Sequence, residues 1–207
     1  MLFFSKKIRA IAGFYKELSM EDRLVPLRKF VTDMSNLIWK TREESEIITN
    51  GKKLLEELVS DYRWIPDEFI QHKSKSYSQH LIYLDPDERF SIICFVWGPG
   101  QNTPVHNHTV WGLVGVIQGE ELCDEFEIVD DFPVYSGSSH KMIPGQVEAV
   151  SPKIGDWHRV SNPTNDVSIS IHVYGGNIGK VVRKQIGYNQ SIEEFISGYS
   201  SESPFIF

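Results

Sequence analysis

Apolar residues in the first third of the chain recur every three or four positions, which is the spacing of one face of an α-helix. The pattern predicts that residues 1–75 form a helical section. The residues of the apolar stripe are Ile8, Ile11, Phe14 and Leu18, followed by Leu24, Leu27, Phe30, Val31, Met34 and Leu37.

Local signals suggest where these helices begin and end. Ser19 with Asp22 three residues later resembles a helix start, and Pro26 suits the first turn of the helix that follows. A further helix is expected in residues 42–60, with a break near Asn50-Gly51, because Asn-Gly pairs favour turns.

The pattern changes at about Tyr77. Short segments rich in β-branched and aromatic residues alternate with Gly, Pro, Asp and Asn, which is typical of a β-sandwich or barrel. Near the end, Ser191 with Glu194 three residues later resembles a capping box and predicts a short C-terminal helix. The segments expected to be strands are HLIYL, FSIICFVWG, VWGLVGVIQG, EAVSPKIG and VSISIHVYGG.

The two parts are expected to form a single structural domain. No linker rich in Gly, Ser or Pro separates them. We therefore expect the helical section 1–75 to pack on a β-barrel formed by residues 76–207, and the fold class to be mainly β.

The composition limits which partners the protein is expected to bind and in which cell compartment it is expected to lie. The chain has 207 residues and a formal net charge of −7, which disfavours general binding to nucleic acids or to anionic membranes. The segment MLFFSKKIRAIAGF does not have the order of a secretory signal, and no apolar run approaches a membrane span of about 18 residues. With only Cys94 and Cys123, we expect free thiols and a cytoplasmic protein without a targeting segment, although one disulfide in a secreted domain would also fit.

Two histidines in the segment PVHNH are candidates for metal ligands. In a strand, His106 and His108 would point to the same face, and imidazole binds iron, zinc, copper and nickel. Two ligands rarely suffice, and His158 in GDWHRVSN is the best candidate for the third. From the spacing alone, a surface strand with outward polar residues explains the pattern equally well.

The sequence around these histidines resembles the two motifs of the cupin superfamily. GQNTPVHNHTVWGLVGVIQG matches most of the first motif, G-x5-H-x-H-x3-4-E-x6-G, and GDWHRVSN matches the second, G-x2-H-x3-N, with the preceding Pro152 displaced by one residue. The resemblance implies a double-stranded β-helix, the jelly-roll barrel. Gly112 stands where many cupins carry a glutamate ligand, which leaves three neutral histidines and favours an anionic ligand such as a thiolate. The matching residues are Gly100, His106, His108 and Gly119 in the first motif and Gly155, His158 and Asn162 in the second.

Within the cupins, residues 77–183 resemble the thiol dioxygenases, the cysteine dioxygenase family. The segment SISIHVYGG places Ser170, His172 and Tyr174 on one strand face, and in the family such residues form a hydrogen-bonded chain that ends at the active-site tyrosine. Gly112 replaces the cysteine that cross-links to this tyrosine in mammalian-type enzymes, which resembles the bacterial branch. Strand alternation alone would also allow His172 to be a core histidine.

Two further positions bear on the substrate. Gln79 stands where cysteine-specific enzymes carry an arginine, and Arg183 matches the carboxylate-binding arginine of the branch that resembles 3-mercaptopropionate dioxygenase. Arginine suits a carboxylate because its planar fork donates two parallel hydrogen bonds. Gln79 would also be ordinary on a strand surface, and Lys184 and Arg159 compete with Arg183 for the same role.

The resemblance implies a non-heme iron(II) thiol dioxygenase. Fe(2+) would be held by the three histidines, and the partners would be O2 and a small thiol acid, with 3-mercaptopropionate favoured and cysteine as an alternative. A metal-binding cupin without redox chemistry, either an isomerase or lyase or a sensor, stays open, as do the preferred thiol and the oligomeric state.

Overall fold

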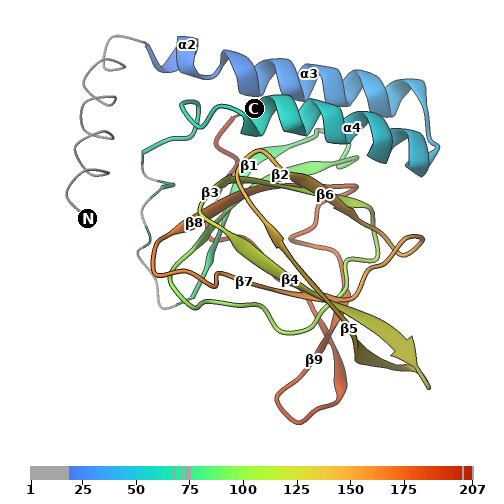
Figure 1. The fold of residues 1–207 in the computed structure, drawn as a ribbon. Coiled ribbons are helices and arrows are strands. Elements are labelled where there is room, and N and C mark those ends of the chain that lie inside the picture. The colour runs from blue at the N-terminus through green and yellow to red at the C-terminus, as the bar shows by residue number, and fades with distance from the viewer. Residues whose placement is uncertain (1–18, 68, 71, 73–75, 202, 207) are drawn as a thin grey trace.

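The computed structural model describes residues 19–67, 69–70, 72, 76–201 and 203–206. The helical stripe expected in residues 8–18 lies outside the described residues. In the described part, three helices lie together on one side of a β-barrel (Figure 1). They are α2 (Met20–Arg23), α3 (Val25–Lys40) and α4 (Glu44–Val59).

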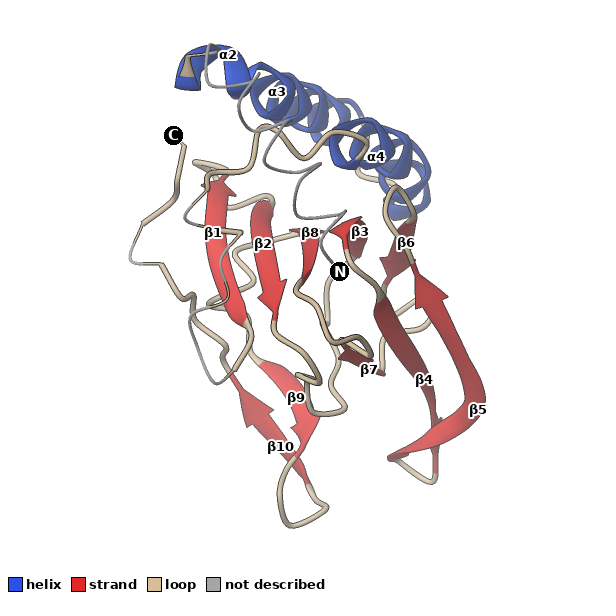
Figure 2. Ribbon diagram, turned by 60° about the vertical axis from the view of Figure 1, so that its left-hand side comes forward, coloured by secondary structure: helices blue, strands red, loops and turns tan. Residues whose placement is uncertain are grey.

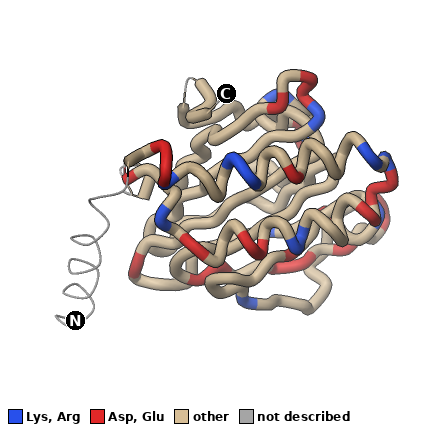
Figure 3. The backbone as a smooth tube through the Cα atoms, turned by 90° about the horizontal axis from the view of Figure 1, so that it is seen from above, with Lys and Arg blue, Asp and Glu red and all other residues tan. Residues whose placement is uncertain are grey.

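The helix starts follow the local signals. The Oγ atom of Ser19 accepts a hydrogen bond from the backbone N–H of Asp22, 3.1 Å away, and Pro26 lies in the first turn of α3. Acidic and basic residues alternate along the outer faces of the helices (Figure 3), where Lys29 pairs with both Asp33 and Glu57. No described helix has the length and apolar character needed to cross a membrane.

The expected break at Asn50-Gly51 is wrong, because α4 continues through it. Gly51 faces the sheet, and a Cβ atom at this position would lie 2.8 Å from Cδ1 of Leu113 and 3.5 Å from the sulfur of Met34. The glycine therefore allows helix and sheet to approach closely, and this packing outweighs the local turn preference of the Asn-Gly pair.

The strands form two facing sheets (Figures 1 and 2). One sheet has the order β1-β2-β8-β3-β6, and the other contains β5-β4-β7. Isolated bridges add the segment 102–106 beside β7, and the hairpin β9-β10 beside that segment. The bounds are β1 Ser78–Leu84, β2 Ser91–Trp97, β3 Gly112–Gln118, β4 Glu121–Val129, β5 Phe132–Met142, β6 Val147–Val150, β7 His158–Ser161, β8 Ser168–Tyr174, β9 Arg183–Ile186 and β10 Ile192–Phe195.

The chain crosses repeatedly between the two sheets. It passes from β2 to segment 102–106, back to β3, across to β4 and β5, back to β6, across to β7 and back to β8. This alternation is the strand order of a double-stranded β-helix, or jelly roll. The predicted fold class, a mainly β jelly-roll barrel with helices at the N-terminal side, is confirmed.

The predicted C-terminal helix is wrong, since its residues form strand β10. Phe195 pairs with Arg183 of β9, and the backbone N–H of Gly187 donates to the carbonyl of Ser191 at 2.8 Å. The hydroxyl of Ser191 donates to Oδ1 of Asn189 in the hairpin turn, 2.6 Å away, and does not cap a helix. Backbone pairing with a strand nearby in the chain therefore overrides the local capping pattern.

The core has two layers, separated by the five-stranded sheet. Alternate residues of β8, which include Ile171 and Val173, face the helices, whereas Ser170, His172 and Tyr174 face the barrel interior. The helices thus cover the outer face of the sheet that carries the predicted polar residues on its inner face. The helix-side cluster includes Leu27, Phe30, Met34, Leu55, Ile82, Ile92, Leu113, Ile171 and Val173, and each fully buried side chain of this kind contributes about 1.5–3 kcal/mol.

Candidate metal centre

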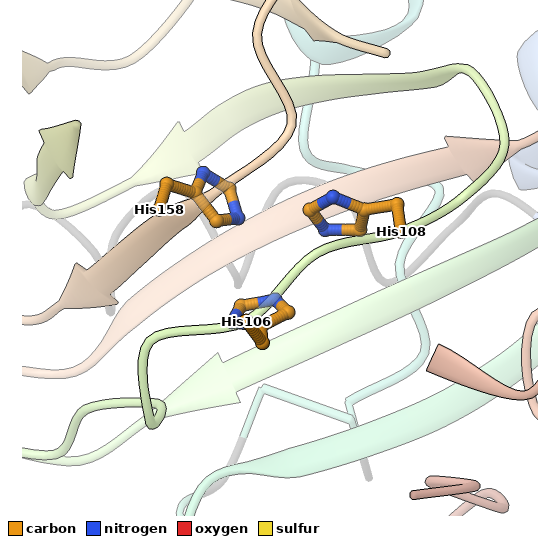
Figure 4. Close-up of side chains that lie close together, drawn as sticks. All are labelled: His106, His108 and His158. Atoms are coloured by element: carbon orange, nitrogen blue, oxygen red, sulfur yellow. The ribbon is translucent and has the colours of Figure 1, made fainter. Parts of the chain in front are cut away.

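The three predicted histidines lie together inside the barrel. His106, His108 and His158 are all buried, and their ligand nitrogens lie within 4.8 Å of one another. Figure 4 shows the three imidazoles directed toward one common space. His106 and His158 also exchange two backbone hydrogen bonds of 3.0 Å, so that the chain itself fixes their separation. Among the described residues, this is the group of His, Cys, Asp and Glu side chains that could hold a metal ion.

Each imidazole is oriented by a contact at its Nδ1 atom. Nδ1 of His106 donates to the carbonyl of Pro104 at 3.0 Å, and Nδ1 of His108 donates to Oδ1 of Asp156 at 3.0 Å. Since a carbonyl and a carboxylate can only accept, these two Nδ1 atoms carry the proton and leave Nε2 free as the ligand atom. Sγ of Cys123 lies 3.5 Å from Nδ1 of the third histidine, His158.

Burial keeps the three imidazoles neutral, which is the form that binds a metal. Burial and the neighbouring histidines lower the pKa values of His106 and His158 well below the usual range. Burial also lowers the pKa of His108, although the carboxylate of Asp156 opposes this effect. At metal–nitrogen distances of about 2.0–2.1 Å, neighbouring ligand nitrogens lie about 3.0–3.4 Å apart, so that the imidazoles would close in on a bound ion. Three neutral imidazoles are a donor set that suits a divalent transition metal.

The packing around position 112 requires a glycine, apart from the question of whether a glutamate ligand could stand there. Gly112 lies opposite Tyr174 in the pairing of β3 with β8, and a Cβ atom at position 112 would lie 2.9 Å from two carbons of the Tyr174 ring. The ring of Tyr174 also stacks on His108, with centroids 5.4 Å apart. The space beside the histidines that a side chain at position 112 would need is thus occupied by the tyrosine.

The structure brings Ser170, His172 and Tyr174 into one hydrogen-bonded chain. The Oγ atom of Ser170 lies 2.9 Å from Nε2 of His172, and Nδ1 of His172 lies 2.8 Å from the hydroxyl of Tyr174. Burial lowers the pKa of His172 and raises the pKa of Tyr174, so that both groups stay neutral near pH 7. Such a chain holds the phenol in place and fixes where its proton can point.

A pocket reaches His106 and His158 from the side of the β9-β10 hairpin. Its walls combine aromatic rings with a single buried cation, Arg183, which is 5% exposed. Nη2 of Arg183 donates to Oγ of Ser197 at 2.7 Å, and its guanidinium carbon lies 4.6 Å from the centre of the Phe195 ring. Its Nε atom is buried without a hydrogen-bond partner, and no described carboxylate forms an ion pair with it. Besides Arg183, the pocket is lined by Tyr77, Gln79, Phe95, Trp97, Thr103, Pro104, His106, His158, Val160, His172, Tyr174, Gln185, Phe195 and Ser197.

The other candidates for substrate binding are placed differently. Arg159 is half exposed and donates two hydrogen bonds to Oδ2 of Asp124, at 2.6 and 2.9 Å. Lys184 is exposed and does not line the pocket. Gln79 lines the pocket, whereas the next residue, His80, lies against Phe69 with ring centroids 4.6 Å apart. Arg183 is therefore the cation that the structure places in the pocket.

Several residues of the site were missed by the sequence analysis. Asp156 accepts from Nδ1 of His108 and from the backbone N–H groups of His108 and Thr109. Its position two residues before His158 was the available signal. The aromatic face of Phe195 was missed because its segment was expected to be helical, and no spacing pattern pointed to Cys123.

No protein-family model matches the chain. Solved structures with a similar fold include an uncharacterized conserved protein with a double-stranded beta-helix domain from Klebsiella pneumoniae. Its sequence is 16% identical, the alignment covers 62% of this chain and 91% of that chain, and the TM-score is 0.44. A cupin superfamily protein from Desulfitobacterium hafniense shares 14% identity over 56% of this chain and 94% of its own, with a TM-score of 0.42. The strand order of the barrel is that of a double-stranded β-helix. An oxalate oxidase in complex with the substrate analogue glycolate is 18% identical over 52% of this chain and 55% of its own, with a TM-score of 0.41. Likenesses of this degree say nothing about the activity of this chain, which must be argued from its own residues.

Proposed function

We propose that the protein is a non-heme iron(II) thiol dioxygenase that converts a small thiol acid and O2 into the corresponding sulfinic acid. The observation that carries the proposal is the buried Arg183, which has no carboxylate partner among the described residues and shares a pocket with His106 and His158, two members of the histidine cluster. A buried cation without a partner is costly, and an anionic ligand would supply the missing partner.

The charges of the site favour a ligand with two negative groups. Three neutral histidines leave a divalent ion with its full charge, and Arg183 adds one positive charge, whereas Asp156 beside His108 subtracts one. A thiolate and a carboxylate on one short chain would balance this excess. Arg183 is suited to the carboxylate because its fork makes two parallel hydrogen bonds.

The protein side chains would bind and orient the substrate and exclude water. Phe95, Trp97 and Phe195 form apolar walls around the polar groups, and the phenol of Tyr174 offers a hydrogen bond inside the pocket. When bound, the ferrous ion supplies the redox chemistry that transfers both oxygen atoms of O2 to the sulfur of the thiolate.

The pocket favours a thiol acid without an α-amine. Gln79 is uncharged, and no Asp or Glu is among the described residues that line the pocket. An α-ammonium group would therefore lose its water without gaining an anionic partner. On this basis we place 3-mercaptopropionate ahead of cysteine and cysteamine.

The test is oxygen uptake by the anaerobically iron-loaded protein with 3-mercaptopropionate, L-cysteine and cysteamine offered separately, and with any sulfinate identified by mass. We expect the fastest uptake with 3-mercaptopropionate. Arg183→Met should raise the KM for the thiol acids, whereas Arg159→Met, which changes the arginine paired with Asp124, should not. Faster uptake with cysteine would overturn the substrate assignment alone.

No uptake with any thiol, from protein shown to hold iron, would overturn the dioxygenase. A metal-binding cupin without redox chemistry, an isomerase, lyase or sensor, would then remain.

A further inference from the structure

Ser197 lies beside the buried cation of the pocket, although no sequence pattern singled it out. It follows Phe195, the last residue of β10, by two positions, and Phe195 pairs across the hairpin with Arg183. The intervening Ile196 is 57% exposed, whereas Phe195 and Ser197 both line the pocket. This alternation continues that of the strand. The hairpin therefore brings an aromatic ring and a hydroxyl group to the same guanidinium.

The hydroxyl of Ser197 accepts a hydrogen bond from Arg183 and directs its own proton elsewhere. Nη2 of Arg183 donates to Oγ of Ser197 at 2.7 Å, and this Oγ donates to the carbonyl of Gly198 at 3.2 Å. Among the residues that the structure describes, no other group accepts a hydrogen bond from this guanidinium, and its Nε atom is buried without a partner. Ser197 is therefore the residue that fixes the orientation of the guanidinium by hydrogen bonding.

The backbone on both sides of Ser197 is tied to the barrel. Before it, β10 pairs with β9. After it, the backbone N–H of Gly198 donates to the carbonyl of Gly179 at 3.1 Å, and that of Ser200 donates to the carbonyl of Gln79 at 2.8 Å. The hydroxyl of Ser197 is thus held in place before a ligand binds. A cation that is oriented in advance loses less conformational entropy when it binds its ligand.

Ser197 orients Arg183 without cancelling its charge. The carboxylate of Asp124 shows the other kind of partner, because it accepts two hydrogen bonds from Arg159, at 2.6 and 2.9 Å, and neutralises that arginine. The hydroxyl of Ser197 is uncharged, so that the positive charge and the free Nε–H of Arg183 stay available to a ligand. A carboxylate fits this cation, because two N–H groups of a guanidinium match its two oxygens.

We propose that Ser197 is a positioning residue that holds the guanidinium of Arg183 in the pocket with its charge unpaired, and that it thereby makes the pocket select ligands that carry a carboxylate. That the ligand also carries a thiol rests on the proposed function, whereas the selection of a carboxylate does not. Loss of the hydroxyl leaves the cation in the pocket but free to turn, so that only the affinity for the carboxylate falls.

The test compares two thiols of the same length. They are 3-mercaptopropionate and 1-propanethiol, in which a methyl group replaces the carboxylate. Each thiol is titrated anaerobically into the full-length protein loaded with zinc, which binds thiolates and has no redox chemistry. The dissociation constants are measured by calorimetry. We expect the wild type to bind 3-mercaptopropionate at least about tenfold more tightly than 1-propanethiol.

Three variants of Ser197 and one control separate orientation from charge. Ser197→Ala should weaken the binding of 3-mercaptopropionate by about tenfold and leave that of 1-propanethiol unchanged. Ser197→Thr keeps the hydroxyl and should bind both thiols like the wild type. Ser197→Asp should pair with Arg183 and weaken the binding of 3-mercaptopropionate by about 100-fold. Ser201→Ala should behave like the wild type, because the hydroxyl of Ser201 accepts from the backbone N–H of Leu81, 2.9 Å away, rather than from Arg183.

A full preference for 3-mercaptopropionate in both Ser197→Ala and Ser197→Asp would overturn the proposal. An equal loss of affinity for the two thiols would also overturn it, because it would show that Ser197 supports the shape of the pocket alone. So would a wild type that does not distinguish the two thiols or binds neither. The zinc-loaded protein oxidises no thiol, so that absence of oxygen uptake by the iron-loaded protein would overturn the dioxygenase and leave these binding results standing.

Discussion

Glu121, the first residue of β4, is a fully buried carboxyl group, and its replacement by glutamine should change how the stability of the protein depends on pH. A carboxyl group whose pKa rises from its ordinary 4.5 to about 7 holds its proton in the folded state at pH values where the unfolded chain releases it. The stabilisation from the protonated form is therefore complete below about pH 4.5 and is lost as the pH rises through about 7. At about 1.4 kcal/mol per pKa unit, the loss reaches about 3 kcal/mol in alkaline solution.

The Glu121→Gln variant would carry no such cost, because an amide does not ionise. Between pH 5 and pH 8.5, the free energy of unfolding of this variant should therefore rise relative to the wild type by about 2–3 kcal/mol. The buried histidines also make stability depend on pH, but they are present in both proteins and cancel in the difference. The comparison of the two proteins thus isolates the one carboxyl group.

The assay is urea unfolding of the metal-free proteins at the two pH values, followed by tryptophan fluorescence. Metal-free protein is used because metal binding would add its own dependence on pH. Glu120→Gln is the control, since Glu120 is partly exposed and pairs with Lys141. A difference between Glu121→Gln and the wild type that stays constant from pH 5 to pH 8.5 would show that burial does not raise the pKa of Glu121, and the reasoning would be refuted.

Three further predictions concern the site and the packing around it. Asp156→Asn should weaken metal binding by about 10–100-fold in a chelator competition, because it removes the charge that holds Nδ1–H of His108; unchanged affinity would contradict the role of this carboxylate. Arg183→Lys should raise the KM for 3-mercaptopropionate by about tenfold or more in oxygen uptake, because the charge is kept but the fork is lost; an unchanged KM would place the carboxylate elsewhere. Gly51→Ala should lower the free energy of urea unfolding by about 1–2 kcal/mol, because the clash of its Cβ with Leu113 exceeds the gain in helix propensity; a more stable variant would show that the helix can move away from the sheet.

The sequence predicted the elements whose residues repeat with a clear period. β2 and β8 alternate between residues that face the helices and residues that face the pocket, and α3 has a stripe of apolar residues that packs on the sheet. The spacing of His106 and His108 also pointed to the histidines that lie together in the structure, although the two residues lie in an irregular segment that makes isolated bridges.

The sequence failed where pairing with another segment outweighed a local signal. Ser191 and Glu194 have the spacing of a capping box, but the antiparallel partner β9 lies a few residues upstream and draws them into a strand. Asn50-Gly51 resembles a turn, but the glycine serves the contact with Leu113. Neither the strand at residues 192–195 nor the unbroken helix α4 can be derived from a few neighbouring residues, because the contact that decides each one comes from another strand.

The lack of a side chain at position 112 and the position of Tyr174 are connected through the same glycine. A side chain at position 112 would begin with a Cβ atom 2.9 Å from the Tyr174 ring and from Cγ2 of Val150. Val150 belongs to the neighbouring strand β6, where it pairs with position 112, so that the new side chain could not move away from the ring toward β6. The ring of Tyr174 would therefore have to move. Such a movement would lengthen the 2.8 Å contact between the tyrosine hydroxyl and His172. This barrel can therefore hold either a side chain at position 112 or the tyrosine ring in its present place beside His108, and Gly112 allows the tyrosine.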